Sequence, residues 1–192
     1  MCGIIAAASN RNVGKLLVQG LHKMEYRGYD SAGIALHQTD QIAHLRTLGK
    51  VKLLEEKMIA EKPKSKLGIA HTRWATHGEP SEENAHPHMS NERVYIVHNG
   101  IIENYLDLKD FLKKEGYSFS SQTDSELIAH LLEYFLNKGN SMLDSMYFTK
   151  EKLDGAYAIA AIDKEDDQNI IIARSKSPLL IGIGMDEFLA AS

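Results

Sequence analysis

The residues best suited to chemistry stand at the beginning of the sequence. Cys2 is the only cysteine among 192 residues, and it directly follows the initiator Met1. A small residue at this position permits removal of Met1, after which Cys2 would carry a free α-amine beside its thiol. The thiol is a nucleophile, and the tethered amine, with a pKa of about 7.7–8.0, is a base that needs no partner from the fold. The alternative is that Cys2 is a small apolar residue at the start of a buried strand.

A second group of candidates lies in residues 71–78. Arg73 ends a predicted strand and begins an irregular segment, where a guanidinium can hold a carboxylate through two parallel hydrogen bonds. The alternative is a surface arginine in a solvated ion pair. Trp74, the only tryptophan, either belongs to the core or covers the site as a lid that excludes water.

Asn99 and Gly100 could stabilise negative charge. The side-chain amide of Asn99 and the unobstructed backbone N–H of Gly100 could together bind the oxyanion of a tetrahedral intermediate. The alternative is a tight turn, since Asn-Gly is the dipeptide most typical of hairpin turns.

Residues 123–126 read Thr-Asp-Ser-Glu and indicate the start of a helix. Thr123 or Asp124 would cap the helix, with Glu126 as the partner in a capping box. A carboxylate at that helix start could also bind a ligand ammonium group. Residues 86–88, His-Pro-His, with His77 nearby, suggest a metal site, but no carboxylate or cysteine stands at ligand spacing. We therefore expect no metal.

Apolar periodicity predicts the elements that position these residues. We expect helices over residues 13–25, 51–61, 105–115, 123–139 and 141–153. We expect strands over residues 3–8, 34–37, 41–48, 67–72, 93–97, 156–163, 170–175 and 179–183. The pattern over residues 117–120 predicts a strand more weakly. Residues 188–192 have the composition of a strand, so we expect the sequence to stop within one. Hairpins interspersed with pairs of helices favour an α+β fold with helices layered on antiparallel sheets. The long irregular segment from 73 to 91 is typical of a functional loop.

Composition narrows the class of protein. The net charge is -4 and the basic residues form no stripe, so we expect neither nucleic acid nor a membrane surface as a partner. One cysteine excludes an internal disulfide and suits a reducing compartment. We find no signal peptide and no apolar run of spanning length, which predicts a cytoplasmic protein.

Six motifs in order along the chain together resemble one family, the glutaminase halves of the glucosamine-6-phosphate synthases. The motifs are MCGI (1–4), YRGYDSAG (26–33), HTRWATHG (71–78), NAHPH (84–88), HNGIIEN (98–104) and TD (123–124). The resemblance covers essentially the whole chain. Other amidotransferases with an N-terminal cysteine have related but different residues in the second and third motifs.

The resemblance implies the fold of N-terminal-nucleophile hydrolases, a four-layer αββα sandwich, and a reaction that needs no cofactor. It implies that Cys2 attacks the side-chain amide of glutamine to give a γ-glutamyl thioester, that ammonia leaves, and that water then releases glutamate. By matching position, Asn99 and Gly100 would form the oxyanion hole.

The resemblance also implies how glutamine is held. Arg73 would bind the α-carboxylate, with Thr76 and His77 beside it, and Asp124 would bind the α-ammonium. Trp74 would gate the passage of ammonia. Two further residues would support the pocket: His86 and Arg27.

The family's glutaminase half continues beyond residue 192, and a sugar-isomerase half then binds fructose-6-phosphate. We therefore expect residues 1–192 to be one glutaminase domain that is incomplete at its C-terminus, and the full-length enzyme to be a possible homodimer. Two alternatives stay open: a non-catalytic glutamine-binding or assembly module, and the glutaminase domain of another N-terminal-cysteine amidotransferase.

Overall fold

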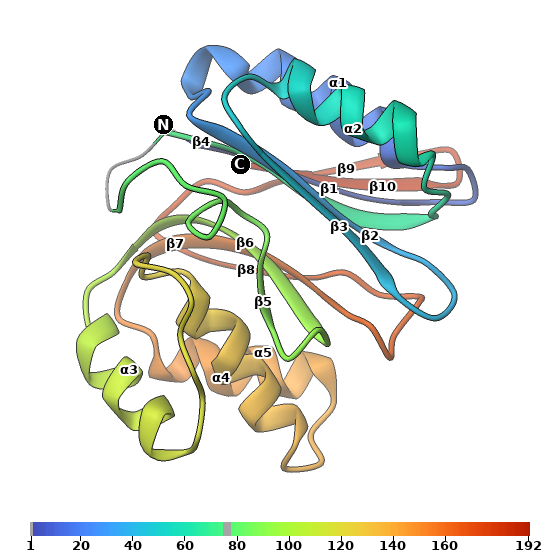
Figure 1. The fold of residues 1–192 in the computed structure, drawn as a ribbon. Helices are drawn as coiled ribbons and strands as arrows, with labels where there is room; N and C mark the ends of the chain where they lie inside the picture. The colour runs from blue at the N-terminus through green and yellow to red at the C-terminus, as the bar shows by residue number, and fades with distance from the viewer. Residues whose placement is uncertain (1, 75–77) are drawn as a thin grey trace.

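Two antiparallel β-sheets lie face to face at the centre of the computed structural model, with helices on both outer faces (Figure 1). The structure describes residues 2–74 and 78–192. The order of layers is helices, sheet, sheet, helices, so the predicted α+β fold and its four-layer αββα arrangement are confirmed. No helix in the described residues is long and apolar enough to cross a membrane.

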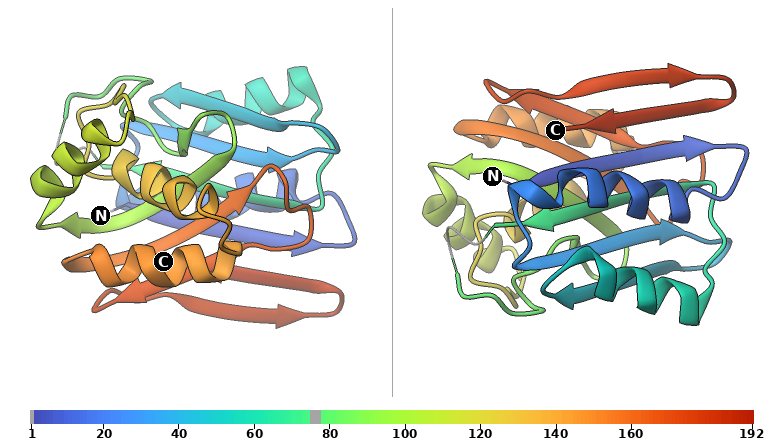
Figure 2. Two further views of the ribbon diagram at one scale, coloured as in Figure 1. Left: turned by 90° about the horizontal axis from the view of Figure 1, so that it is seen from below. Right: turned by 90° about the horizontal axis from the view of Figure 1, so that it is seen from above.

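The first sheet has six strands in the order β3-β2-β4-β1-β10-β9. Two helices, α1 (Gly14–Met24) and α2 (Val51–Glu61), run across its outer face (Figure 2, right). Its strands are β1 (Gly3–Ser9), β2 (Ser31–His37), β3 (Ile42–Leu48), β4 (Leu67–Arg73), β9 (Leu180–Gly184) and β10 (Glu187–Ala191). The first strand of the chain is therefore an interior strand, between β4 and β10.

The second sheet has four strands in the order β5-β6-β7-β8. Three helices cover its outer face (Figure 2, left). The strands are β5 (His88–Ser90), β6 (Val94–Ile102), β7 (Gly155–Asp163) and β8 (Ile171–Ser175), and the helices are α3 (Tyr105–Lys114), α4 (Glu126–Leu136) and α5 (Met142–Lys152).

Three apolar clusters fill the spaces between the four layers of helices and sheets. Successive residues of a strand point to opposite faces of its sheet, so each strand contributes side chains to the clusters on both sides. In β1, Ile5 and Ala7 pack with the helices α1 and α2, whereas Ile4 and Ala6 point between the two sheets. Because both faces of β1 are covered, its sequence is apolar throughout rather than alternating. The third cluster joins the second sheet to α3, α4 and α5.

Two local predictions are wrong. No strand forms over residues 117–120, because the backbone N–H groups of Ser120 and Ser121 donate to the carboxylate of Glu126. For the same reason Glu126 does not act as a capping-box partner. The helix α4 begins at Glu126 with Ser125 as its N-cap, and neither Thr123 nor Asp124 caps it.

Candidate active site

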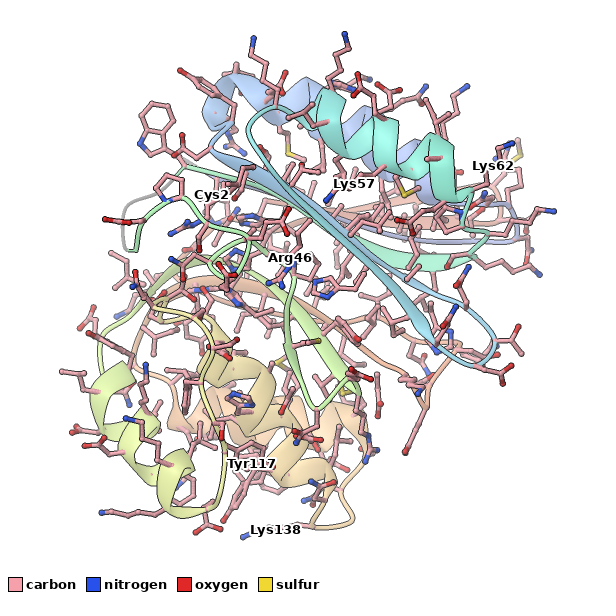
Figure 3. The ribbon with its side chains drawn as sticks, viewed as in Figure 1. Cys2, Arg46, Lys57, Lys62, Tyr117 and Lys138 are labelled. Atoms are coloured by element: carbon pink, nitrogen blue, oxygen red, sulfur yellow. The ribbon has the colours of Figure 1, made fainter. Side chains whose placement is uncertain are left out.

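Strand pairing places Cys2 beside the end of β4. Gly3 is paired with Thr72, so the residues just outside this pair, Cys2 and Arg73–Trp74, come together. Figure 3 shows Cys2 at one end of the sandwich. The backbone N–H of Trp74 donates to Cys2 Sγ over 3.3 Å, and Sγ lies 3.6 Å from the Trp74 carbonyl oxygen. Both backbone groups of Trp74 thus contact the sulfur and hold the thiol in place. Cys2 is only partly buried, so a substrate can reach it.

Asn99 reaches the same point from the second sheet. Its Nδ2 donates to the backbone oxygens of Cys2 and Ser192, over 3.4 Å each, and its Oδ1 lies 3.0 Å from Nε2 of His71. The tight-turn alternative is wrong, because Asn99 and Gly100 lie inside β6 and pair with β7. The ladder between β6 and β7 thus overrides the local turn preference.

Gly100 has a shape that only glycine provides at this position. Its φ is +139°, and an added Cβ would lie 2.0 Å from the carbonyl oxygen of Ala156 on β7. The absence of a side chain therefore lets β6 approach the backbone of β7 closely at this position.

A pocket of about 40 Å³ opens above the thiol. It is lined by Cys2, Arg73, Trp74, His86, His98, Gly100, Thr123, Asp124 and Ser125. A larger hollow of about 550 Å³ lies at the opposite ends of β1, β2 and β4, beside Asn10, His37 and Leu67. We assign the chemistry to the smaller pocket, because it alone of the two contains the thiol, with the opposite charges of Arg73 and Asp124 beside it.

Arg73 and Asp124 supply those opposite charges. Burial lowers the pKa of the Arg73 guanidinium, and the negative charges of the Cys2 thiolate, Asp30 and Asp124 oppose that shift. Arg73 Nη2 donates to the carbonyl oxygen of Gly78 over 3.3 Å. Asp124 Oδ2 accepts the backbone N–H of Ile102 over 2.8 Å, which fixes this carboxylate at the end of β6. A cation and an anion in one small pocket suit a zwitterionic ligand.

Four buried histidines form the floor of the pocket and the layer that supports it: His86 and His98 line the pocket, and His71 and His88 pack against His86. The His86 ring stacks on His71 with centroids 4.1 Å apart and meets His88 edge-on at 4.5 Å. Burial is the largest influence on each and lowers their pKa values, to about 3 for His71 and His88, so the rings are neutral near pH 7. In the described residues, no group of three or more His, Cys, Asp or Glu side chains is arranged to hold a metal ion.

Hydrogen bonds connect this floor to the loop before α4. His98 Nδ1 lies 2.8 Å from Ser125 Oγ, and His88 Nε2 lies 3.0 Å from Thr123 Oγ1. His86 behaves differently, because neither of its ring nitrogens has a hydrogen-bond partner in the described part of the chain. His86 lines the pocket, and both of these nitrogens are themselves buried.

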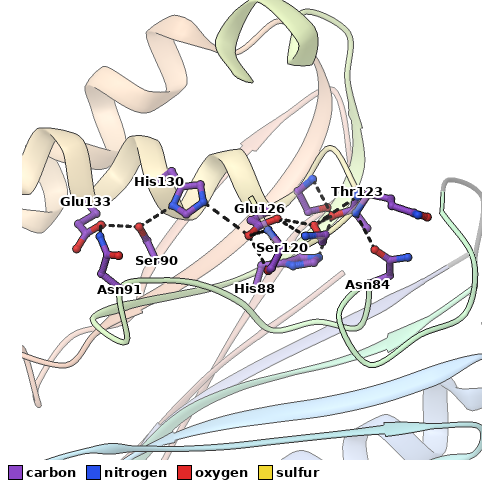
Figure 4. A network of polar contacts seen from close by, with 12 residues as sticks. Asn84, His88, Ser90, Asn91, Ser120, Thr123, Glu126, His130 and Glu133 are labelled. Atoms are coloured by element: carbon purple, nitrogen blue, oxygen red, sulfur yellow. Dashed lines mark hydrogen bonds and ion pairs between the residues drawn. The ribbon is translucent and has the colours of Figure 1, made fainter. Parts of the chain in front are cut away.

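Glu126 holds that loop from the other side (Figure 4). Its carboxylate accepts the backbone N–H and the hydroxyl of Ser120, both over 2.8 Å, and the same two groups of Ser121, both over 2.7 Å. Nε2 of His130 lies 3.7 Å away. Burial raises the pKa of Glu126, but these hydrogen bonds outweigh it and hold the pKa well below its usual range. The position of Asp124 therefore depends on an ionised Glu126.

The structure brings most of the predicted site residues together. Cys2, Arg73, Trp74, His86, Gly100 and Asp124 line one pocket, and Asn99 contacts Cys2. Arg27 is not among the lining residues; it lies in a short 3₁₀ helix (Glu25–Arg27), and the next residue, Gly28, packs against the backbone of Arg73 and Trp74. The candidates Thr76 and His77 lie outside the described residues.

Sequence reasoning missed His71, His98 and Ser125 as members of the site. The signal for His71 was available in the twofold strand pattern. His71 shares a face of β4 with Ile69, a residue of the layer between the sheets, and a polar side chain in that layer needs a partner.

The model of one protein family matches residues 71–192, and it describes the glutamine amidotransferase domain. Glutamine–fructose-6-phosphate aminotransferases (isomerizing) are 49% identical in Vibrio parahaemolyticus and 51% identical in Haemophilus ducreyi, over 100% of this chain and 32% of each relative. The chain thus spans about a third of the length of these curated relatives.

Solved structures agree with the sequence relatives. The glutamine phosphoribosylpyrophosphate amidotransferase of B. subtilis, complexed with ADP and GMP, superposes with a TM-score of 0.84 at 26% identity, over 99% of this chain and 41% of that chain. An allosteric regulatory enzyme of purine biosynthesis gives 0.86 at 27% identity, over 100% and 42%. The fold, the pocket around Cys2 and the family match together establish that this chain belongs to the glutamine amidotransferase family.

Proposed function

We propose that this chain hydrolyses the side-chain amide of glutamine to glutamate and ammonia through a thioester on Cys2. The observation that carries the proposal is the convergence on Cys2 of the Asn99 amide, which donates to the Cys2 backbone oxygen, and of opposite charges from Arg73 and Asp124 in the same pocket. A nucleophile, an oxyanion donor and a zwitterion clamp are what amide hydrolysis of a free amino acid requires.

The chemistry begins after removal of Met1. The α-amine of Cys2 takes the thiol proton, and the thiolate adds to the amide carbon, so the carbonyl oxygen becomes an oxyanion that accepts hydrogen bonds from Asn99 Nδ2 and the Gly100 N–H. Collapse of this intermediate breaks the C–N bond while the ammonium of Cys2 returns its proton to the leaving nitrogen. Ammonia departs, and a water molecule, deprotonated by the same amine, releases glutamate from the thioester.

The amino-acid end of glutamine is bound by charge. Arg73 holds the α-carboxylate, and Asp124 holds the α-ammonium. The side chain of Trp74, which is 45% exposed at the mouth of the pocket, gates the departure of ammonia. Two residues support the pocket from outside its reacting centre: His86 and Arg27.

The longer relatives suggest what happens to the ammonia. They are named for an aminotransferase acting on fructose-6-phosphate, and this chain matches about a third of their length. We propose that residues 1–192 belong to a glutaminase domain that, in a longer, homodimeric chain, passes ammonia to fructose-6-phosphate to form glucosamine-6-phosphate. We place this enzyme in the cytoplasm, where a single catalytic thiol stays reduced.

The test combines kinetics with intact mass. The wild-type protein should lack Met1, gain one adduct from a glutamine-analogue electrophile, and release glutamate and ammonia in equal amounts. Cys2→Ala should abolish both products and the adduct while still binding glutamine, because Arg73 and Asp124 remain. Turnover in Cys2→Ala would refute the nucleophile, and glutamine binding without turnover in the wild type would favour a non-catalytic binding module.

A further inference from the structure

We propose that His71 is a positioning residue, which holds the side-chain amide of Asn99 with its nitrogen directed at the reacting centre. The proposal rests on the function proposed above, because it concerns the group that would donate to the oxyanion. His71 Nε2 lies 3.0 Å from Asn99 Oδ1, whereas the two contacts of Asn99 Nδ2 are each 3.4 Å long. Among these three side-chain hydrogen bonds of Asn99, the shortest is thus the one to His71, behind the pocket.

The orientation of this amide matters because its two ends have the same shape and opposite polarity. With Nδ2 toward Cys2, the amide donates to a developing oxyanion. Rotated by half a turn, it would present a second oxygen there, which repels the oxyanion and also the backbone oxygens of Cys2 and Ser192. An amide that samples both orientations would therefore lose transition-state stabilisation without losing its place in the fold.

His71 favours the productive orientation through its protonation state. Burial lowers the pKa of its ring to about 3, so the neutral ring carries a single N–H. Asn99 Oδ1 can only accept, so that proton lies on Nε2, and an Nε2–H group cannot accept a bond from a rotated Nδ2. The tautomer of His71 and the orientation of Asn99 consequently fix each other.

The fold holds the His71 ring still. His71 lies on β4, is 1% exposed, and stacks on His86 with an interplanar angle of 30°. Asn99 lies on β6 of the other sheet, so the bond crosses the layer between the two sheets beside the nucleophile. A ring held by burial and by this stacking can transmit its own orientation to the amide.

Two substitutions separate hydrogen bonding from packing. His71→Phe keeps an aromatic ring against His86 but removes the donor, and kcat for glutamine hydrolysis should fall about 10- to 100-fold, up to the loss of an oxyanion donor. KM should stay within about threefold, because the amide acts mainly in the transition state. His71→Gln keeps an N–H donor, and most of kcat should return. His37→Phe, a buried strand histidine at the other end of the sandwich, should leave kcat unchanged.

A double-mutant cycle with Asn99→Ala tests whether His71 acts through Asn99. When residue 99 has no amide, His71→Phe should lower kcat by less than about twofold further. Independent, multiplying losses would overturn the proposal. These outcomes differ from failure of the proposed function, for in that case Cys2→Ala or Asn99→Ala alone would keep near wild-type hydrolysis.

The wild-type protein supplies a measurement that does not depend on variants folding. Nitrogen NMR of protein labelled in histidine should show His71 as the neutral Nε2–H tautomer, and melting curves identify any variant that is simply unfolded. An Nδ1–H tautomer, or full activity in a folded His71→Phe, would contradict the positioning role.

Discussion

The position of Asp124 depends on a buried carboxylate, and Glu126→Gln is the sharpest test of that dependence. The substitution keeps the shape of the side chain but replaces one acceptor oxygen by an NH₂ group. That group would face the N–H and hydroxyl of either Ser120 or Ser121, which now donate over 2.7–2.8 Å. Donors would then point at donors inside the protein.

The magnitude follows from the number of bonds lost. Two of the four hydrogen bonds lose their acceptor, and each bond to a charged group contributes about 1.5–3 kcal/mol. Glu126→Gln should therefore lower the free energy of unfolding at pH 7 by about 3–6 kcal/mol, or the melting temperature by roughly 6–24 °C for a chain of this size. KM for glutamine should rise as well, because the loop that carries Asp124 loses hydrogen bonds that fix it to Glu126.

The pH dependence has a defined sign. The folded-state pKa of Glu126 is lowered, so its contribution is fully present above the unfolded pKa of about 4.3 and is lost as the pH falls toward the folded value. In urea denaturation, the stability difference between wild type and Glu126→Gln should be constant from pH 7 to about pH 5.5 and should shrink below about pH 4.

A matched control at an exposed glutamate separates the effect of burial from the effect of the Glu-to-Gln change itself. Glu61→Gln, exposed at the end of α2, should change the free energy of unfolding by less than about 0.5 kcal/mol. A loss below about 1 kcal/mol in Glu126→Gln at pH 7, or a difference that grows in acid, would refute the reasoning.

Two further substitutions probe the wall of the pocket formed by β6. Asn99→Asp should lower kcat by about a hundredfold or more, because a carboxylate replaces the oxyanion donor. It should also lower the melting temperature, because the carboxylate faces the backbone oxygens of Cys2 and Ser192; steady-state kinetics beside a melting curve would show a near-normal kcat if Asn99 has no such role. Gly100→Ala should cost about 2 kcal/mol or more in urea denaturation, because its Cβ would meet the Ala156 oxygen at 2.0 Å and its φ is +139°. An unchanged denaturation midpoint would show that the β6–β7 ladder shifts without cost.

Much of the fold could be predicted because its elements are strongly patterned. The helix expected over residues 51–61 is α2 (Val51–Glu61), and the strands that flank the pocket were placed to within two residues at the ends that carry Cys2 and Arg73. These ends are determined by local apolar periodicity, which a single sequence contains.

The features that were predicted wrongly or not at all depend on partners distant in sequence. Residues 117–120 have strand-like composition, yet Glu126 takes their backbone donors. Asn99-Gly100 has the composition of a turn, yet Tyr157 and Ala158 on β7 pair with it. The contact between His71 and Asn99 joins two sheets and leaves no local pattern, so only the assembled sandwich reveals it.

The interior position of β1 also affects when its sheet can be completed during synthesis of the chain. The strand that follows Cys2 is among the first segments made on the ribosome, and its neighbour β10 (Glu187–Ala191) follows it by about 180 residues. At about 5–20 residues per second, roughly ten to forty seconds of synthesis separate them. Until then, β1 has β4 as its only sheet neighbour, and the bonds between Ile4 and Ser192 cannot form. That interval keeps the N-terminus accessible to the peptidase that would remove Met1, so maturation of the nucleophile can precede closure of the sheet around it.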